Sequence, residues 1–242
     1  MFSFFKKRNL VTDISWLGVD IHSHILPGID DGAKNMGQSL SYIRQMTELG
    51  FERLIFTPHI FKELYPNTQD TILPVLENVK AELDNEDIRI QIGAAAEYML
   101  DYDFAAGDSL LCLPNNHLLI EMSYLSETPN IEDVIFDLQI KGYKLVLAHP
   151  ERYNFYHNNL QRYTRLHEMG CLFQMNLLSI VGYYGPEVRN ASKYLLQKNM
   201  YDLAGSDLHH DKHMALLKNN IQNGVLYNLI GSYPFLNKEI FI

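Results

Sequence analysis

One local pattern occurs four times along the chain: apolar residues at helical spacing, a residue that stops a helix, and a short apolar run with a polar end. In the first copy the helical spacing covers residues 40–49, Gly50 follows, and the run FERLIFTPH comes next. The other copies have Gly142, Gly170 and Asn199 at the stop position. Gly and Asn tolerate the left-handed conformation that ends a helix. Helices alternating with buried strands predict an α/β fold with a parallel sheet.

Three further segments have the character of strands: WLGVDIHSH, IRIQIGAAAEY and NHLLIEMS. The total is then seven expected strands in 242 residues, with no linker or low-complexity stretch between them. Seven strand–helix units in one domain fit a small or distorted (β/α) barrel, and an open doubly wound sheet is the alternative.

Six of the seven expected strands end in imidazole or carboxylate side chains. These are His22, His24, His59, Glu97, Glu121, His149, Asp207 and His209. Function in parallel barrels lies at the carboxyl ends of the strands, so we expect these side chains to meet. Residues two apart in an extended segment share a face, which pairs His22 with His24. Mixed imidazole and carboxylate ligands suit Mn, Fe or Zn, and bridging carboxylates favour a metal cluster over a closed structural site.

Two loops beside these strand ends carry further candidates. Asp30 and Asp31 lie in LPGIDDGAK, which is either a simple turn or a loop from which one Asp reaches the metals. Arg152 in HPERY offers two parallel donors to a phosphate or carboxylate, or else forms an ion pair with Glu151 or another acid. Asn176 is a weak ligand or an orienting residue.

The remaining histidines fall into two sets. His117, His157 and His167 are expected at a loop or on helices, facing solvent. His210 and His213 follow the last strand closely, and either they orient ligands or contact the substrate, or they have no part in the site.

Composition excludes several classes of protein. The net charge of −9 argues against a nucleic-acid-binding surface. Cys112 and Cys171 form no CxxC pair and lie in apolar surroundings, so we expect inert thiols, no disulfide scaffold and a cytoplasmic location. The sequence contains no run of 18 apolar residues, so it predicts no membrane-spanning helix. In the opening segment FSFFKKR the aromatic residues precede the basic residues, which is the reverse of a signal peptide. This segment either touches a membrane surface or is a docked or frayed terminus.

The motifs in their order resemble a known family. The strings are DIHSHILPGIDDGAK, TPH, AAAEY, LIEMS, LAHPERY, QMN and GSDLHH. They resemble the PHP (polymerase and histidinol phosphatase) superfamily and, within it, the bacterial CpsB-type tyrosine-protein phosphatases linked to capsule and exopolysaccharide synthesis. The resemblance runs from Val19 to the C-terminus. It implies a single metallophosphatase domain over residues 19–242 after an N-terminal extension of residues 1–18.

The resemblance also implies a site. The family has a distorted (β/α)7 TIM-like barrel, the PHP fold, that holds three metal ions, commonly Mn. The positions that match its metal ligands are His22, His24, Asp31, His59, Glu97, Glu121, His149, Asp207 and His209. Arg152 matches its phosphate-gripping arginine. Several relatives carry another Arg after the position of Asp207, where this chain offers only Lys212 and His213 to hold the distal side of the phosphate.

These features predict a metal-dependent phosphatase that acts on phosphotyrosine, with the C-terminal tail of a capsule-controlling tyrosine kinase as the expected partner. Two or three divalent ions would activate a water and, together with Arg152, offset phosphoryl charge. His209, His213 or bulk water would protonate the leaving oxygen. Two alternatives remain open: a small-molecule phosphatase of the histidinol-phosphate type or a phosphodiesterase on the same fold, and a metal-bound regulatory partner of a kinase without catalysis.

Overall fold

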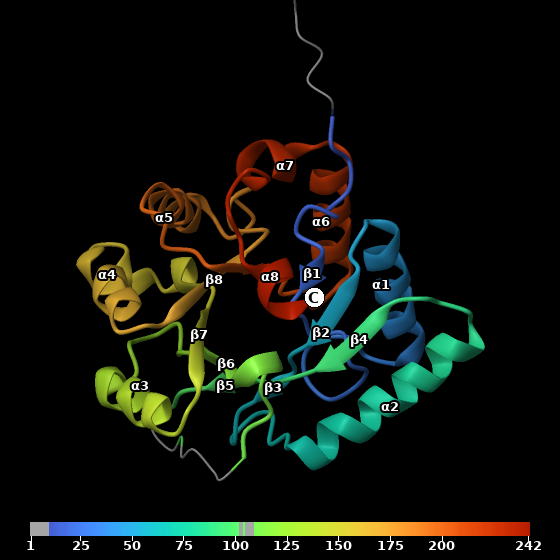
Figure 1. Ribbon diagram of the computed structural model, residues 1–242, viewed down its shortest axis with the longest axis horizontal. Coiled ribbons are helices and arrows are strands. Elements are labelled where there is room, and N and C mark those ends of the chain that lie inside the picture. Colours follow the sequence, from blue (N-terminus) through green and yellow to red (C-terminus); the bar gives the residue numbers. More distant parts are fainter. Residues whose placement is uncertain (1–9, 102–103, 105–108) are drawn as a thin grey trace, which may run out of the picture.

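The computed structural model describes residues 10–101, 104 and 109–242; the segment FSFFKKR, for which a membrane contact was considered, lies outside the described residues. Most of the helices lie around the outside of the strands, and the C-terminal helix lies near the middle of the view (Figure 1). The α-helices are α1 (Met36–Glu48), α2 (Gln69–Asn85), α3 (Ile131–Ile140), α4 (Gln161–Glu168), α5 (Pro186–Gln197), α6 (Asp211–Gln222), α7 (Val225–Ile230) and α8 (Asn237–Phe241). Short 3₁₀ turns are η1 (Pro114–Asn116), η2 (Pro150–Arg152) and η3 (Asn154–Tyr156).

The strands are short and all of their pairings are parallel. They are β1 (Val19–Asp20), β2 (Arg53–Phe56), β3 (His59–Ile60), β4 (Gln91–Ala94), β5 (Glu97–Met99), β6 (His117–Glu121), β7 (Lys144–Ala148), β8 (Leu172–Asn176) and β9 (Leu203–Gly205). One sheet has the order β1-β2-β4 and the other the order β3-β5-β6-β7-β8-β9. The predicted α/β class with parallel strands is confirmed.

Seven strand segments were predicted, and the described residues contain nine strands because two of those segments are each interrupted. Thr57 and Pro58 separate β2 from β3, and a proline has no N–H to continue the ladder. Ala95 and Ala96 separate β4 from β5, and the N–H of Ala96 donates to Leu111 O at 3.1 Å, outside the sheet.

The first and last strand segments lie side by side. Asp207 N donates to His22 O at 2.7 Å, and His24 N donates to Leu208 O at 2.9 Å. At the other end of these segments the buried Asn237 of α8 donates to both Val19 O and Ala204 O. These contacts bring the ends of the strand order together, as a barrel requires; a closed barrel stays a prediction.

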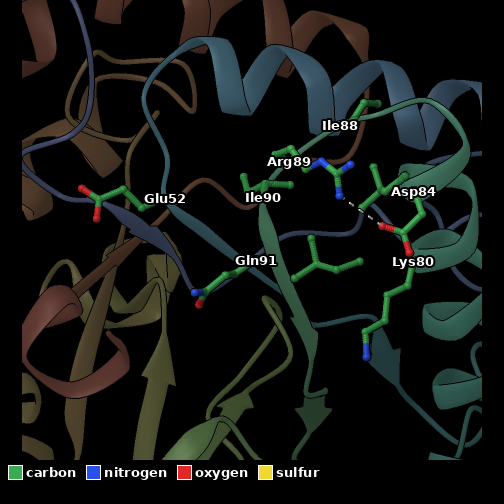
Figure 2. A pocket seen from close by; sticks show the side chains of 9 residues that line it. Glu52, Lys80, Asp84, Ile88, Arg89, Ile90 and Gln91 are labelled. Atoms are coloured by element: carbon green, nitrogen blue, oxygen red, sulfur yellow. Dashed lines mark ion pairs between the residues drawn. The ribbon is translucent and has the colours of Figure 1, made fainter.

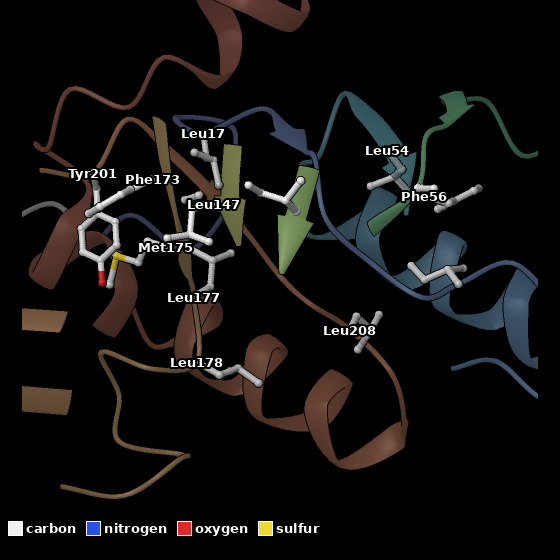
Figure 3. Packing of buried hydrophobic residues seen from close by; sticks show 14 of the residues in the cluster. Leu17, Leu54, Phe56, Leu147, Phe173, Met175, Leu177, Leu178, Tyr201 and Leu208 are labelled. Carbon is white, nitrogen blue, oxygen red and sulfur yellow. The ribbon is translucent and has the colours of Figure 1, made fainter. Parts of the chain in front are cut away.

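Both faces of the strands are packed, which explains their nearly continuous apolar sequences. Leu54 and Phe56 on β2 belong to the large cluster beneath the helices, part of which Figure 3 shows. Ile55 between them belongs to a second cluster on the opposite face. That inner cluster contains Leu119 of β6 and is covered by Phe241 of α8.

The four predicted helix stops are confirmed. Gly50, Gly142, Gly170 and Asn199 follow α1, α3, α4 and α5 with φ of 100°, 90°, 88° and 53°. Residues ahead of the predicted domain boundary also pack, since Ile14 and Leu17 are buried in the large cluster. Among the described helices, none combines the length and apolar character needed to cross a bilayer.

Candidate metal centre

The nine predicted ligand residues lie together at the carboxyl ends of the strands. Four groups of side chains each bring three or four ligand atoms within 4.8 Å of one another. The groups are His24, Asp31, His59 and His209; His22, His24 and Asp207; His22, Glu97 and His149; and His59, Glu97 and Glu121. Four residues belong to two groups each, so the groups form one continuous cluster.

Alternation along the strands aims the glutamates at this cluster. Leu119 and Glu121 are two apart on β6, so their side chains leave the same face of the sheet. Leu119 packs in the inner cluster, and Glu121 therefore lies above it at the carboxyl end of the strand. Ala95 and Glu97 repeat this relation in the third segment.

Three imidazole rings are held through Nδ1, which leaves Nε2 facing the cluster. His22 Nδ1 lies 2.8 Å from Gln174 Oε1, and His24 Nδ1 lies 2.7 Å from Asp30 Oδ2. His209 Nδ1 lies 2.9 Å from the carbonyl of Asp207. Hydrogen bonds of this kind fix the tautomer and direction of metal-binding histidines.

Two buried carboxylate oxygens support the fit of a metal. Glu97 Oε2 and Asp207 Oδ1 have no hydrogen-bond partner, although the protein buries both. Glu97 Oε2 lies 3.3 Å from His22 Nε2 and 3.4 Å from His24 Nε2. Buried anionic oxygens are costly without a partner, and a cation among these atoms supplies one. The residues present therefore fit divalent ions.

Charge within the cluster shifts several pKa values. Burial lowers the pKa of His59, but the nearby carboxylates of Glu121 and Glu97 outweigh burial and raise it to about 10. Burial raises the pKa of Asp30, but the charge of His24 and its hydrogen bond outweigh burial and lower the pKa of that carboxyl to about 2. The raised pKa values favour protons on rings such as His24 and His59 beside the carboxylates, and cations bound here would take over that role.

Two members of the cluster have left-handed backbone. His149 has φ of 33° and Asp207 has φ of 50°. Such conformations cost roughly 1–3 kcal/mol for residues with side chains and occur where a site requires them. His149 directly follows β7, and Asp207 lies two residues after the end of β9.

Arg152 lies beside the cluster with aromatic rings on its guanidinium. Its Cζ is 4.8 Å from the ring centroid of Tyr124 and 4.3 Å from that of Tyr184. Its Nη1 donates to Asp207 Oδ2 at 2.5 Å. The acid that pairs with Arg152 is thus a candidate ligand, whereas the Glu151 carboxylate turns away and accepts from Asn176 N and the Tyr201 hydroxyl.

The cluster opens into a cavity of about 250 Å³. A second cavity, of about 490 Å³, adjoins it through four shared residues: Asp31, Arg152, Asp207 and His209. A larger cavity, about 570 Å³, lies elsewhere, where α2 leads into β4 (Figure 2). The described residues that line it are aliphatic or polar, with Arg89 paired to Asp84 and Asp87. It lies at the amino end of β4, away from the cluster, and is not the candidate site.

With this geometry in view, the comparisons with known proteins are specific. A family model described as "Capsular polysaccharide synthesis, CpsB/CapC" matches residues 18–222. This chain belongs to the CpsB/CapC family. It is 30% identical over 198 residues to the tyrosine-protein phosphatase YwqE of Bacillus subtilis, covering 80% of this chain and 78% of that protein. It is 29% identical to the tyrosine-protein phosphatase CpsB of Streptococcus agalactiae over 200 residues, 79% of this chain and 82% of that protein.

Solved structures agree. The fold matches a chain from crystal structures of YwqE from Bacillus subtilis and CpsB from Streptococcus pneumoniae, described as unique metal-dependent tyrosine phosphatases. The TM-score is 0.77 at 28% identity, covering 92% of this chain and 90% of that one. A lactonase from Listeria monocytogenes, 12% identical with a TM-score of 0.56, shares the fold alone. The family predicted from the motifs is confirmed, and with it the expected enzyme class, a phosphoric monoester hydrolase.

Within this CpsB/CapC member, the two residues expected on the distal side of the phosphate have different surroundings. Lys212 is exposed, with Nζ 5.2 Å from the ring centroid of Tyr183. His213 is buried, and its Nδ1 accepts a hydrogen bond from His209 N. Both line the second cavity, and their contact with phosphate stays a prediction.

Of the three histidines expected at a loop or on helices, the prediction for His117 is wrong, whereas His157 lies in a turn and His167 on α4. His117 is only 3% exposed, because it begins β6, where its ring contacts Phe241 and its Nδ1 lies 2.7 Å from Pro114 O. His157 and His167 are half-buried, and they contact Glu151 O and the Asp202 carboxylate. A single histidine carries no periodic signal, so its burial was not readable from neighbouring residues.

One orienting residue of the site, Gln174, was not predicted from the sequence, whereas another, Asn176, was. Gln174 on β8 orients His22 and also lies 3.4 Å from His149 N. Asn176, considered as a weak ligand or an orienting residue, donates to Asp207 Oδ2 at 2.8 Å. The only available signal for Gln174 was a polar residue in the middle of the otherwise buried run CLFQMN.

Gly32 in the DDG motif provides a sharp test of loop geometry. A Cβ atom at Gly32 would lie 1.8 Å from His24 O, which already accepts a hydrogen bond from Ala33 N. Gly32→Ala is therefore expected to displace the loop, loosen His24 and lower both bound metal and activity at least about tenfold. Metal analysis and kinetics on the purified variant check this. Gly93→Ala is the matched control, because a Cβ there meets nothing within 4 Å.

The thiols are expected to play no part in catalysis. Cys171 directly precedes β8, at the end of the strand opposite the cluster. Burial raises the pKa of Cys112 to about 11 and that of Cys171 to about 12, so neither is a thiolate at neutral pH. A variant with Cys112→Ser and Cys171→Ala should keep most of the phosphatase activity. Loss of all activity in the folded, metal-loaded variant would instead indicate a cysteine nucleophile.

Proposed function

We propose that this protein is a metal-dependent phosphatase that hydrolyses phosphotyrosine on a tyrosine kinase of capsule or exopolysaccharide synthesis. The observation that carries the proposal is one cavity that combines the histidine–carboxylate cluster, including two unpartnered buried carboxylate oxygens, with the guanidinium of Arg152. A phosphate dianion requires both cations and fork-shaped donors, and this cavity offers both.

The nine residues of the cluster would hold two or three divalent ions, with Mn expected and Fe or Zn as alternatives. When bound, such ions neutralise phosphoryl charge and acidify a water molecule. Gln174 and Asp30 keep the rings of His22 and His24 in their binding direction. Arg152 would bind phosphoryl oxygens while Asp207 and the two tyrosine rings hold its guanidinium.

The proton for the leaving tyrosyl oxygen would come from His209, His213 or water. The expected substrate is the C-terminal tail of the cognate kinase, since the family is described by capsular polysaccharide synthesis. We also propose a cytoplasmic location, because the two cysteines are free thiols, which are typical of a reducing compartment.

Removal and return of metal test the function. EDTA is expected to abolish hydrolysis of a phosphotyrosine peptide, and Mn²⁺ should restore it more effectively than Mg²⁺, because imidazole ligands favour Mn²⁺. Histidinol phosphate, assayed in parallel, should be the poorer substrate. Full activity in excess chelator would contradict the metal mechanism, and a preference for histidinol phosphate would point to the small-molecule alternative.

A further inference from the structure

The cavity above the metal cluster has an apolar side that the chemistry of phosphate does not require. Phe61, Leu64, Tyr65, Met99 and Tyr124 line it together with the ligand side chains. Pockets for small ligands are typically about 300–1,000 Å³. At about 250 Å³ this cavity accommodates one side chain rather than a folded segment.

The apolar side chains at residues 61–65 are held on a short fixed loop. Phe61 N donates to Tyr65 O at 2.9 Å, and Tyr65 N donates to Phe61 O at 2.7 Å. Asn67 Nδ2 fastens the end of the loop by donating to both Ile29 O and His59 O. The loop is therefore tied to β3 and to the segment that precedes the DDG motif, and it keeps its position relative to the cluster.

Rings from two segments rest directly on histidines of the cluster. Tyr65 stacks on His59, with centroids 5.4 Å apart and an interplanar angle of 15°. Tyr124, in the segment after β6, stacks on His149 at 5.9 Å and 27°. Aromatic surface therefore lies directly beside two of the candidate ligand rings in the lining of the cavity.

The exposure of the Leu64 side chain has no explanation in the packing of the fold. Leu64 is 66% exposed, although it lines the cavity. Single exposed leucines are common, but this one lies on a fixed loop at the entrance to a charged site. The aromatic ring of a phosphotyrosine whose phosphate is bound in the cavity would cover the Leu64 side chain. The short side chain of phosphoserine has no ring that could contact Leu64 in this way.

We infer that Phe61, Leu64, Tyr65, Met99 and Tyr124 form a subsite for the aromatic ring of the substrate, and that this subsite selects aryl over alkyl phosphate monoesters. The inference rests on the proposed function and deepens it. Contacts with the ring are present both before and during the reaction, so they lower KM and leave kcat nearly unchanged. The phosphate end is bound by the cluster and Arg152 for any monoester, and the ring subsite adds the preference.

Leu64→Ala tests the subsite, because an exposed position allows the change without disturbing the fold. With Mn²⁺ present, we expect kcat/KM for phenyl phosphate to fall about three- to tenfold through KM. The value for ethyl phosphate and the inhibition by inorganic phosphate should stay unchanged. Leu125→Ala is the matched control, since Leu125 is 91% exposed and lies outside the described lining of the cavity.

The outcomes distinguish failure of the ring subsite from failure of the proposed phosphatase function. Equal losses on both monoesters, or no loss on either, would overturn the ring subsite while leaving the phosphatase proposal intact. Absence of hydrolysis of both monoesters by the wild-type protein with Mn²⁺ would contradict the proposed function itself. Phosphotyrosine and phosphoserine peptides of one sequence should repeat the aryl preference and its loss in the Leu64 variant.

Discussion

Asp207→Ala is expected to lower phosphatase activity by at least about two orders of magnitude and to reduce the metal bound per chain. Asp207 Oδ1 lies 3.4 Å from His22 Nε2 and 3.5 Å from His24 Nε2, with no hydrogen-bond partner of its own. Its other oxygen accepts from Arg152 and Asn176. The substitution therefore removes a negative charge from the cluster and frees the guanidinium at the same time.

Metal analysis of protein purified without chelator, together with kcat/KM on a phosphotyrosine peptide, measures both effects. Asp211→Ala is the matched control: Asp211 begins α6 four residues later, is exposed, and accepts a hydrogen bond from the Tyr42 hydroxyl. It should keep both metal and activity. An Asp207 variant with wild-type metal content and rate would remove this carboxylate from the centre.

The fold class was predictable because its signals are local and repeated. Helical spacing followed by Gly50 or Asn199 marks a helix end, and the structure has the left-handed φ at each of these positions. The interruptions of the strands were less visible. Pro58 could have indicated the first of them, but the turn of the Ala96 N–H toward Leu111 depends on a segment distant in sequence.

The candidate ligands were predictable for a related reason. Parallel strands all end at one edge, so a polar residue at each strand end predicts a meeting of side chains without knowledge of their distances. The residues that orient the ligands follow no such rule. Gln174 reaches His22 across 152 positions of sequence, and the ring of Tyr184 reaches Arg152 from the segment between β8 and α5. Such pairs are set by tertiary packing and leave no periodic trace.

Arg152 is expected to show the second large effect. A guanidinium that holds phosphate through two parallel hydrogen bonds cannot be replaced by an ammonium group of equal charge. Arg152→Lys should therefore lower kcat/KM on phosphotyrosine roughly 10- to 100-fold. Metal content and melting temperature should stay near those of the wild type, because the ligand atoms remain in place.

The structure also allows the opposite outcome, in which Arg152 serves mainly as the ion-pair partner of Asp207. Lysine would then preserve much of the interaction, and Arg152→Ala would lower stability and metal content more than the rate per bound metal. Arg162→Lys is the matched control, since Arg162 pairs with Glu127 and Glu132 away from the cavity and should change kcat/KM little. If the Arg152→Lys variant has unchanged kinetics, Arg152 does not grip the phosphate, and the metals with Lys212 or His213 must hold it. A selective loss of kcat/KM with metal retained assigns the grip to the guanidinium between Tyr124 and Tyr184.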